Sequence, residues 1–305
     1  MDSEPITFDV SARFGEPTTV EGTVLAAEGP ADERPVLVCL PGGTYTRAYW
    51  DLEVPGHEGY SFARAAAGRG FTVVTLDGLG TGESSRPARE VDLAVQAEGA
   101  AAVVAQLPDL LGRNAPVVAV GHSMGGYLAL TQQAAHHSYA GLAILGTTNL
   151  PVVQLDLPPE VVAAAATPEG RVAVIDQIAS AISEPYILGD RAPMRSWFHL
   201  EDVPTAVIEA DDASTLTVVP RRCAAESSTP GVTLAAAEAV RVPVFVAYGE
   251  VDVSPDPHTD AACYRSSSDV TLYLLAGSAH CHNMARTRQR LWDRLLDWCA
   301  SAIVS

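Results

Sequence analysis

Six short apolar runs, rich in β-branched residues, constrain the fold more than any other feature of this sequence. The runs are 35–40, 72–77, 116–121, 141–146, 242–248 and 270–275. Each predicts a strand that is buried on both faces of a sheet. Alanine- and leucine-rich stretches with helical periodicity cover 92–111, 124–137 and 287–303. This alternation predicts an α/β fold in which helices cover both faces of a mostly parallel sheet.

Two regions depart from the alternation. Residues 5–14 and 17–27 have the pattern of less apolar strands and predict an antiparallel hairpin at the sheet edge. Residues 148–240 contain several prolines, short helical patterns and no clear strand, so we expect a helical insertion between two strands. The predicted domains are a core formed by 1–147 and 241–305, and a helical cap formed by 148–240.

Charge and cysteine content limit the expected partners and compartment. The formal net charge of −18 and the pI near 4.7 repel phosphate backbones and anionic lipids, so neither nucleic acid nor a membrane is an expected partner. No apolar run approaches a membrane span, the first ten residues lack a signal-peptide pattern, and we expect a cytoplasmic protein. Five scattered cysteines without a CxxC pair indicate free thiols. The apolar C-terminal helix is expected to pack on the sheet and indicates no particular oligomeric state.

A nucleophile elbow is predicted around Ser123. The sequence Gly121-His122-Ser123-Met124-Gly125 follows a predicted strand and opens a predicted helix, which is the context that the G-x-S-x-G motif requires. The serine must lie in a sharp, strained turn, where the flanking glycines let neighbouring backbone approach without a Cβ clash. Because the first N–H groups of a helix lack intrahelical partners, the Met124 N–H is the expected first donor to an oxyanion. This context disfavours the alternative, an incidental turn of small residues.

The second oxyanion donor is expected from the loop after the 35–40 strand. Residues 40–45 read LPGGTY, and the glycine pair would keep a backbone N–H exposed to the site. Gly43 or Thr44 is the expected donor, and Gly42 would shape the turn. The alternative is a plain Gly-Gly turn without a catalytic role.

These motifs together resemble those of the α/β-hydrolases. The resemblance covers nearly the whole chain, through the LPGG loop at 40–43, the DGLGTGES segment at 77–84, the GHSMG elbow at 121–125 and a C-terminal histidine. The segment at 77–84 is similar to the D-x-x-G-x-G-x-S stretch of many members. The resemblance implies an eight-stranded sheet, a cap inserted after the sixth strand, and a catalytic triad in the order serine, acid, histidine.

Asp252 and His280 have the positions of the acid and the histidine in such a triad. Asp252 follows the fifth of the six apolar runs with G-x-x-D spacing, and Glu250 is its near competitor. His280 follows the sixth run, whereas His282 would face another way if its segment is helical. A triad needs only one imidazole, with Nδ1–H bonded to the acid and Nε2 facing the serine hydroxyl. We therefore favour Asp252 and His280.

A metal site is the alternative interpretation of the C-terminal histidines. It would use His280, Cys281 and His282, with or without His136 and His137. Ligands this close in sequence rarely converge on one tetrahedral ion, and no further pair has zinc-like spacing, so we expect no metal. His282 is then expected to orient its loop or to lie at the pocket rim, and His122 to support the elbow.

The predicted reaction is hydrolysis through an acyl-enzyme, without a cofactor. His280 would take the Ser123 proton as Oγ attacks a carbonyl, Asp252 would hold the imidazole, and water would resolve the acyl-enzyme. A serine at the nucleophile position disfavours dehalogenase and epoxide hydrolase chemistry, for which similar proteins use aspartate there.

The expected substrate is a small-molecule ester or lactone that is moderately bulky and apolar. The residues expected to contact it are Gly42, Tyr45, His122, Trp197 and Phe198. Further side chains expected to cover the substrate are Leu150, Val152, Val153, Tyr186, Met194 and His199. His57, Tyr49 and Trp50 are expected to line an entrance. For the cap residues, packing onto the core is an equally open alternative.

Two other functions use the same residues or the same fold. A thioesterase for carrier-bound or coenzyme A acyl groups would need a basic entrance, for which the cap offers Arg171, Arg191, Arg195, Arg221 and Arg222. A non-catalytic binding protein usually has a damaged triad, which this sequence does not show. Carbon–carbon bond hydrolysis and cofactor-free lyase chemistry also share these residues.

Overall fold

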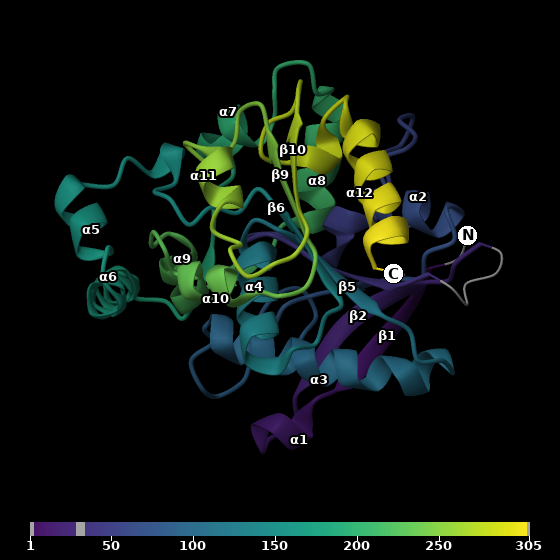
Figure 1. The fold of residues 1–305 in the computed structure, drawn as a ribbon, viewed down its shortest axis with the longest axis horizontal. Helices are drawn as coiled ribbons and strands as arrows, with labels where there is room; N and C mark the ends of the chain where they lie inside the picture. The colour runs from purple at the N-terminus through teal and green to yellow at the C-terminus, as the bar shows by residue number, and fades with distance from the viewer. Residues whose placement is uncertain (1–2, 29–33, 304–305) are drawn as a thin grey trace.

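An eight-stranded sheet forms the centre of the computed structural model, which describes residues 3–28 and 34–303. The strand order is β1-β2-β4-β3-β5-β6-β9-β10 (Figure 1). The strands are β1 (Ser3–Asp9), β2 (Thr19–Leu25), β3 (Val36–Leu40), β4 (Val73–Leu76), β5 (Val117–His122), β6 (Gly141–Leu145), β9 (Val244–Gly249) and β10 (Val270–Leu275). From β4 to β10 all neighbours pair in parallel. The predicted α/β fold and its six parallel strands are confirmed.

The predicted N-terminal hairpin is also confirmed, with a shorter first strand. β1 pairs antiparallel with β2 from Ser3↔Leu25 to Asp9↔Thr19, and β2 pairs antiparallel with β4. The first strand ends at Asp9, whose Oδ1 accepts a hydrogen bond from the Ser11 N–H at 2.9 Å and starts the one-turn helix α1 (Ser11–Phe14).

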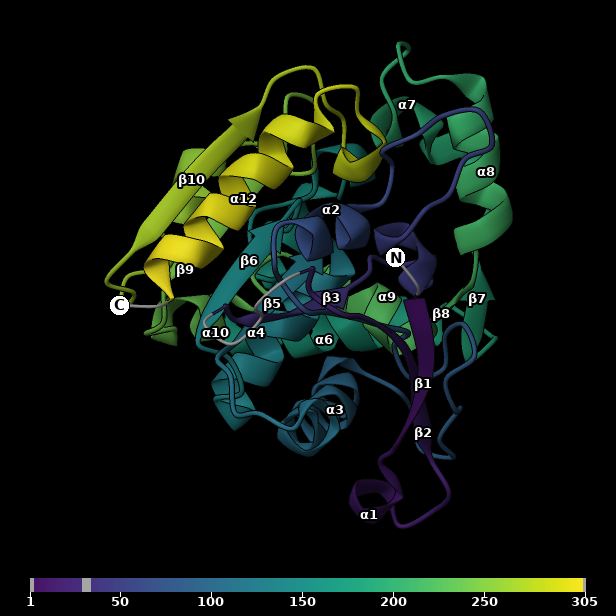
Figure 2. The ribbon, with the colours of Figure 1, turned by 90° about the vertical axis from the view of Figure 1, so that its right-hand side faces the viewer.

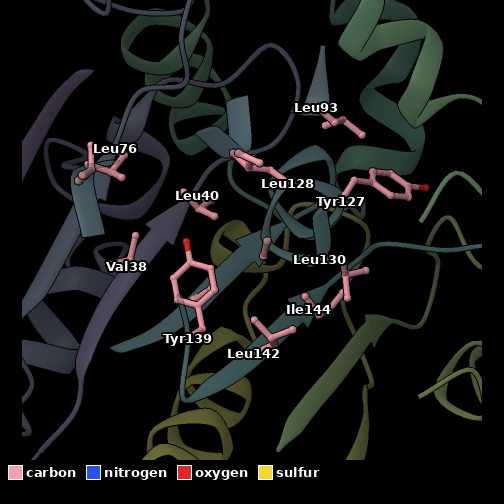
Figure 3. Close-up of a cluster of buried hydrophobic side chains, with 14 of the residues drawn as sticks. Val38, Leu40, Leu76, Leu93, Tyr127, Leu128, Leu130, Tyr139, Leu142 and Ile144 are labelled. Atoms are coloured by element: carbon pink, nitrogen blue, oxygen red, sulfur yellow. The ribbon is translucent and has the colours of Figure 1, made fainter. Parts of the chain in front are cut away.

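Four helices cover the two faces of the sheet. α2 (Phe62–Gly68) and α12 (Arg288–Ala302) lie on one face, and α3 (Leu93–Leu111) and α4 (Met124–His136) on the other (Figure 2). Strand β3 shows how the two cores arise from the period of two along a strand. Leu37 and Cys39 pack with α2 and α12, whereas Val36, Val38 and Leu40 pack with α3 and α4. Figure 3 shows this second cluster.

The last strand departs from the predicted burial. The 270–275 run was expected to be buried on both faces, but β10 is the edge of the sheet, and Val270 and Leu274 are 38% and 47% exposed. An apolar run of this kind can form an edge strand or a central strand, so the sequence pattern does not show which of the two it forms.

The segment between β6 and β9 is mostly helical. Its helices are α5 (Pro159–Ala164), α6 (Pro168–Ser180), α7 (Arg195–Phe198), α8 (Thr205–Thr215), α9 (Arg221–Ser227) and α10 (Leu234–Ala239). The prediction that it has no strand was wrong, because β7 (Tyr186–Leu188) and β8 (Val218–Pro220) pair antiparallel. Strands of three residues are too short for a periodic pattern. α5 and α6 stand apart from the sheet at the left of Figure 1.

The remaining helical elements are single turns. They are η1 (Arg47–Trp50), η2 (Val153–Leu155), η3 (Ala192–Met194), α11 (Pro257–Ala261) and η4 (His282–Met284). All five cysteines are free, as predicted, and all are buried. No helix in residues 3–28 and 34–303 combines the length and apolar character that crossing a membrane requires.

Candidate active site

Ser123 lies at the sharp turn between β5 and α4. Its backbone has φ +54° and ψ −118°, a conformation that is strained for a residue with a side chain. The close approach of backbone explains the glycines of the motif. A Cβ on Gly121 would lie 2.4 Å from the Gly125 carbonyl oxygen, and a Cβ on Gly125 would lie 2.2 Å from that of Leu40. Neither position can hold a larger residue without displacing the backbone around Ser123.

The Asp252 carboxylate is the most densely bonded acceptor near this turn. It accepts hydrogen bonds of 2.7 Å from the backbone N–H groups of Gly249 and Val253 and from the imidazoles of His280 and His282. Burial alone would raise the pKa of Asp252, but the charges and hydrogen bonds of the two imidazoles hold it well below its ordinary value. The acid is therefore ionised at neutral pH.

Both C-terminal histidines reach the same carboxylate, so the expectation that His282 faces another way is wrong. His280 Nδ1 bonds to Asp252 Oδ1 and His282 Nε2 bonds to Asp252 Oδ2. The His282 N–H donates to the His280 carbonyl at 3.0 Å, and this tight turn brings the two rings to one acceptor. Because an ionised carboxylate can only accept, the bond to His280 requires a proton on Nδ1. Glu250 instead accepts from the Gly277 N–H on the exposed side of the loop.

His122 braces the backbone that carries His280. Its Nε2–H donates to the His280 carbonyl at 2.8 Å, and its ring stacks on Tyr49 with centroids 4.7 Å apart. Burial lowers the pKa of His122 well below its ordinary value, and the neighbouring His280 and His282 lower it further. His122 is therefore neutral, with its one proton committed to a carbonyl, which suits it for support and not for proton transfer.

The loop after β3 lies beside Ser123 and, within the described residues, carries two N–H groups that have no bonded acceptor. A hydrogen bond of 3.3 Å from the Tyr45 N–H to the Gly42 carbonyl closes a turn in which Thr44 has φ +69°. A Cβ on Gly42 would lie 3.2 Å from the Ser123 Cβ, so this position must stay small. Within the described residues, no acceptor is bonded to the N–H of Gly43 or Thr44. Either group is available to an oxyanion.

A cavity of about 230 Å³ brings these parts together. Ser123 and His280 line it, and Asp252 lies behind His280. The other predicted site residues also line it: Gly42, Gly43, Thr44, Tyr45, His122, Met124, Trp197 and Phe198. The sequence did not indicate the further lining residues Tyr127, Gly146, Leu155, Val219, Ala224, Ser227, Ser228 and Val253. None of the described residues that line this cavity is Asp, Glu, Lys or Arg.

Several aromatic residues expected at the entrance lie elsewhere. Tyr49 and Trp50 are each 1% exposed and belong to the core under α2 and α12, so that expectation was wrong. His57 lines a separate surface cavity beside Tyr60 and Trp292. Of the expected covering residues, Val152 and Met194 line the cavity. Leu150, Val153, Tyr186 and His199 do not.

Gly146, at the end of β6, is a site residue that no motif indicates. Its φ is +59°, and a Cβ there would lie 3.0 Å from both Cε1 and Nδ1 of His280 and 3.3 Å from Cε1 of His282. The two imidazoles therefore pack against the bare backbone of this glycine. The only signal in the sequence is a glycine at the end of an apolar run, which is also common at ordinary turns.

The sheet, the elbow and the order of these residues define an α/β hydrolase. The chain belongs to the alpha/beta hydrolase family, whose sequence profile matches residues 37–293. No curated protein matches the chain in sequence.

Solved structures with the same fold include enzymes of several kinds. A thermophilic esterase from Thermogutta terrifontis has a TM-score of 0.66 at 20% identity, covering 98% of this chain and 99% of that one. A monoglyceride lipase from Saccharomyces cerevisiae has a TM-score of 0.69 at 16% identity over 95% and 94% of the two chains. A haloalkane dehalogenase from Bradyrhizobium elkanii has 0.61 at 16% identity over 99% and 97%. At these identities the likeness is one of fold, and the reaction must be argued from the site.

Proposed function

We propose that this protein is a serine hydrolase that cleaves an uncharged carboxylic ester or lactone with a short to medium apolar acyl group. One observation carries the proposal: Ser123 and His280 line the same uncharged cavity, and Asp252 is bonded to His280 Nδ1 behind it. This order of groups suits a base that receives the serine proton and passes it to the leaving alcohol.

Each group then has one role. His280 Nε2 accepts the Ser123 proton as Oγ attacks the carbonyl, and Asp252 keeps the imidazole in the required tautomer and stabilises its charged form. The Met124 N–H at the start of α4, with the N–H of Gly43 or Thr44, stabilises the oxyanion. Water then attacks the acyl-enzyme, with His280 again as the base.

The cavity supports an uncharged substrate of limited size. At about 230 Å³ it is small beside the roughly 300–1,000 Å³ of typical ligand pockets. Trp197 and Phe198 from α7 and Val219 from β8, all in the insertion, supply apolar wall to the cavity. We therefore propose that residues 148–240 act as the cap over the acyl group.

The arginines that would favour a thioesterase are engaged elsewhere. Four of the five pair with carboxylates: Arg191 with Asp211 and Asp212, Arg195 with Asp212, Arg221 with Glu90, and Arg222 with Asp176. The fifth, Arg171, donates to the Ala165 carbonyl at 3.1 Å. None of them lines the cavity. An ester or lactone therefore suits the site better than a phosphopantetheine thioester.

A cytoplasmic location belongs to the same proposal. It is supported by the five free cysteines, all of them buried, because thiols persist in a reducing compartment.

The test compares wild type with Ser123→Ala and with Ser180→Ala, a control on the exposed end of α6. Substrates are p-nitrophenyl esters from acetate to palmitate, simple lactones and acyl-coenzyme A thioesters, together with a fluorophosphonate label. We expect turnover of the shorter esters and labelling by wild type and Ser180→Ala, and neither by Ser123→Ala. Wild type that hydrolyses nothing and resists the label would contradict the proposal and favour a binding protein. Faster cleavage of thioesters than of oxygen esters would contradict the substrate class alone.

A further inference from the structure

One buried arginine connects the segment after β6 to the loop that holds the free N–H groups. Arg191 is 4% exposed and precedes η3. Its Nε–H donates to Thr44 Oγ1 at 3.1 Å and its Nη2–H donates to the Thr44 carbonyl oxygen. Arg191 is therefore bonded to the hydroxyl and the carbonyl oxygen of one loop residue, although it does not itself line the cavity.

Thr44 is a residue that needs to be held. Its φ of +69° lies in the left-handed region, where a β-branched side chain is an outlier and where glycine would be the ordinary choice. The Thr217 N–H also donates to the Thr44 carbonyl, at 3.0 Å, and the Thr46 N–H donates to Thr215 at 2.8 Å. Side-chain and backbone bonds from residues 186–220 thus converge on this strained turn.

The arginine is itself fixed from three sides. Its Cζ lies 3.7 Å above the Tyr45 ring, and its Nη1–H donates to Thr215 Oγ1 at 2.9 Å. Asp211, which is fully buried, lies 3.7 Å from Nη1 and accepts a 2.9 Å hydrogen bond from the Tyr45 hydroxyl. A planar guanidinium can bond Thr44 and stack on Tyr45 at once, which the point charge of a lysine cannot do.

We propose that Arg191 is a positioning residue for residues 41–46, which we call the oxyanion-binding loop. By holding Thr44 in its left-handed conformation, it keeps the N–H groups of Gly43 and Thr44 directed to the cavity beside Ser123. The proposal rests on the proposed function, because it assigns Arg191 a part in the stabilisation of the oxyanion. It predicts that Arg191 affects the reaction rate more than substrate binding.

The test compares four variants of the full chain. They are Arg191→Met, Arg191→Lys, the double variant Arg191→Met with Asp211→Asn, and Arg195→Met as the control. Arg195 is half-exposed and pairs with Asp212, so its loss removes a neighbouring charge without touching the loop. The double variant is needed because Arg191→Met alone leaves the Asp211 carboxylate buried without a cation and can unfold the protein.

We expect Arg191→Met and the double variant to lower kcat and the fluorophosphonate labelling rate by roughly 10- to 100-fold. This is less than the ~10²- to 10³-fold loss for deleting an oxyanion donor outright, because the N–H groups remain but are no longer held. KM should change by less than about threefold, because the cavity lining is unchanged. Arg191→Lys should recover part of the rate, and Arg195→Met should match wild type.

Hydrogen exchange separates this proposal from the proposed function. The peptide that covers residues 41–46 should exchange faster in the double variant than in Arg195→Met. A folded double variant with wild-type labelling rate and exchange would overturn the positioning role and leave the hydrolase intact. If wild type resists the label, the proposed hydrolase function is overturned. Faster exchange of residues 41–46 in the double variant would then still support the hold of Arg191 on Thr44. Unchanged exchange would overturn that hold as well.

Discussion

Replacing Gly146 with alanine should slow catalysis by displacing the His280 ring, in addition to the stability that it loses through the strained backbone. The added Cβ would lie 3.0 Å from Cε1 and Nδ1 of His280, whereas ordinary contacts begin at 3.4 Å. The His280 ring must therefore retreat by at least the difference, 3.4 − 3.0 = 0.4 Å, from a position fixed by its bond to Asp252. Because a misplacement of about 1 Å can cost about 10²-fold in rate, we expect kcat to fall roughly 10- to 100-fold, or about 1.4–2.7 kcal/mol.

Gly112→Ala is the matched control, because it separates backbone strain from the displacement of the ring. Gly112 has φ +64°, close to the +59° of Gly146, but a Cβ there would meet nothing within 4 Å. Both variants should lose about 1–2 kcal/mol of stability from the left-handed backbone. Only Gly146→Ala should lose activity, because only its Cβ reaches the imidazoles.

The measurement is kcat on a short p-nitrophenyl ester, with the free energy of unfolding from urea titration of each variant. A folded Gly146→Ala protein that keeps more than half of the wild-type kcat would refute the reasoning. It would mean that the His280 ring tolerates the shift or that His280 is not the base. An equal loss of kcat in Gly112→Ala would show that general destabilisation, and not ring placement, governs activity.

Three further outcomes follow from the bonding of Asp252. Asp252→Asn should lower kcat by about 10³- to 10⁴-fold, because an amide does not hold the imidazole in the required tautomer. The control Glu250→Gln should keep kcat within about twofold of wild type, measured on the same ester. His282→Leu should lower kcat, because the Asp252 carboxylate loses one of its four hydrogen bonds and then holds the His280 ring less firmly; an unchanged kcat would contradict this. Because the pKa of Asp252 is lowered in the folded state, its contribution to stability is complete above about pH 4 and is lost as the pH falls further. Urea unfolding at pH 7 and pH 2.5 should therefore show that Asp252→Asn loses less stability on acidification than wild type.

Local patterns were enough to predict the sheet and the elbow. Each central strand is an apolar run bounded by turn residues, so its bounds in the sequence could be predicted without knowing which strands pair with it. The strand predicted at 116–121 and the helix predicted at 124–137 flank the GHSMG sequence, and they correspond to β5 and α4. The glycines of that sequence lie where a Cβ would clash with backbone around Ser123. The proximity of Asp252 to His280 followed from both lying after neighbouring parallel strands, whose carboxyl ends meet at one edge.

Features that depend on side-chain direction or on distant contacts could not be predicted. The ring of His282 points to Asp252 because of one backbone bond within residues 280–282, and no periodic pattern encodes that bond. Tyr49 and Trp50 follow the LPGG loop, but their side chains pack in the core. They lie on the single helical turn η1, which is too short for a sequence pattern to show which side faces the core. Gly146 matters only because two imidazoles from a different strand loop pack on it.

Backbone hydrogen bonds join the inserted segment to two loops of the site. The N–H groups of His280 and Cys281 donate to the carbonyls of Trp197 and Phe198 in α7, at 3.0 and 2.9 Å. Residues 215–217 bond in the same way to residues 44–46 on the other side of the cavity. A swing of residues 186–220 away from the core would therefore break backbone hydrogen bonds to the loop of His280 and to the oxyanion-binding loop together. α5 and α6 stand apart from the sheet (Figure 1), and among the described residues no backbone hydrogen bond joins them to either loop. We therefore expect motion that preserves the site in that part of the insertion. The proposed reacting groups lie in the family motifs, but residues outside those motifs bond to two of their loops.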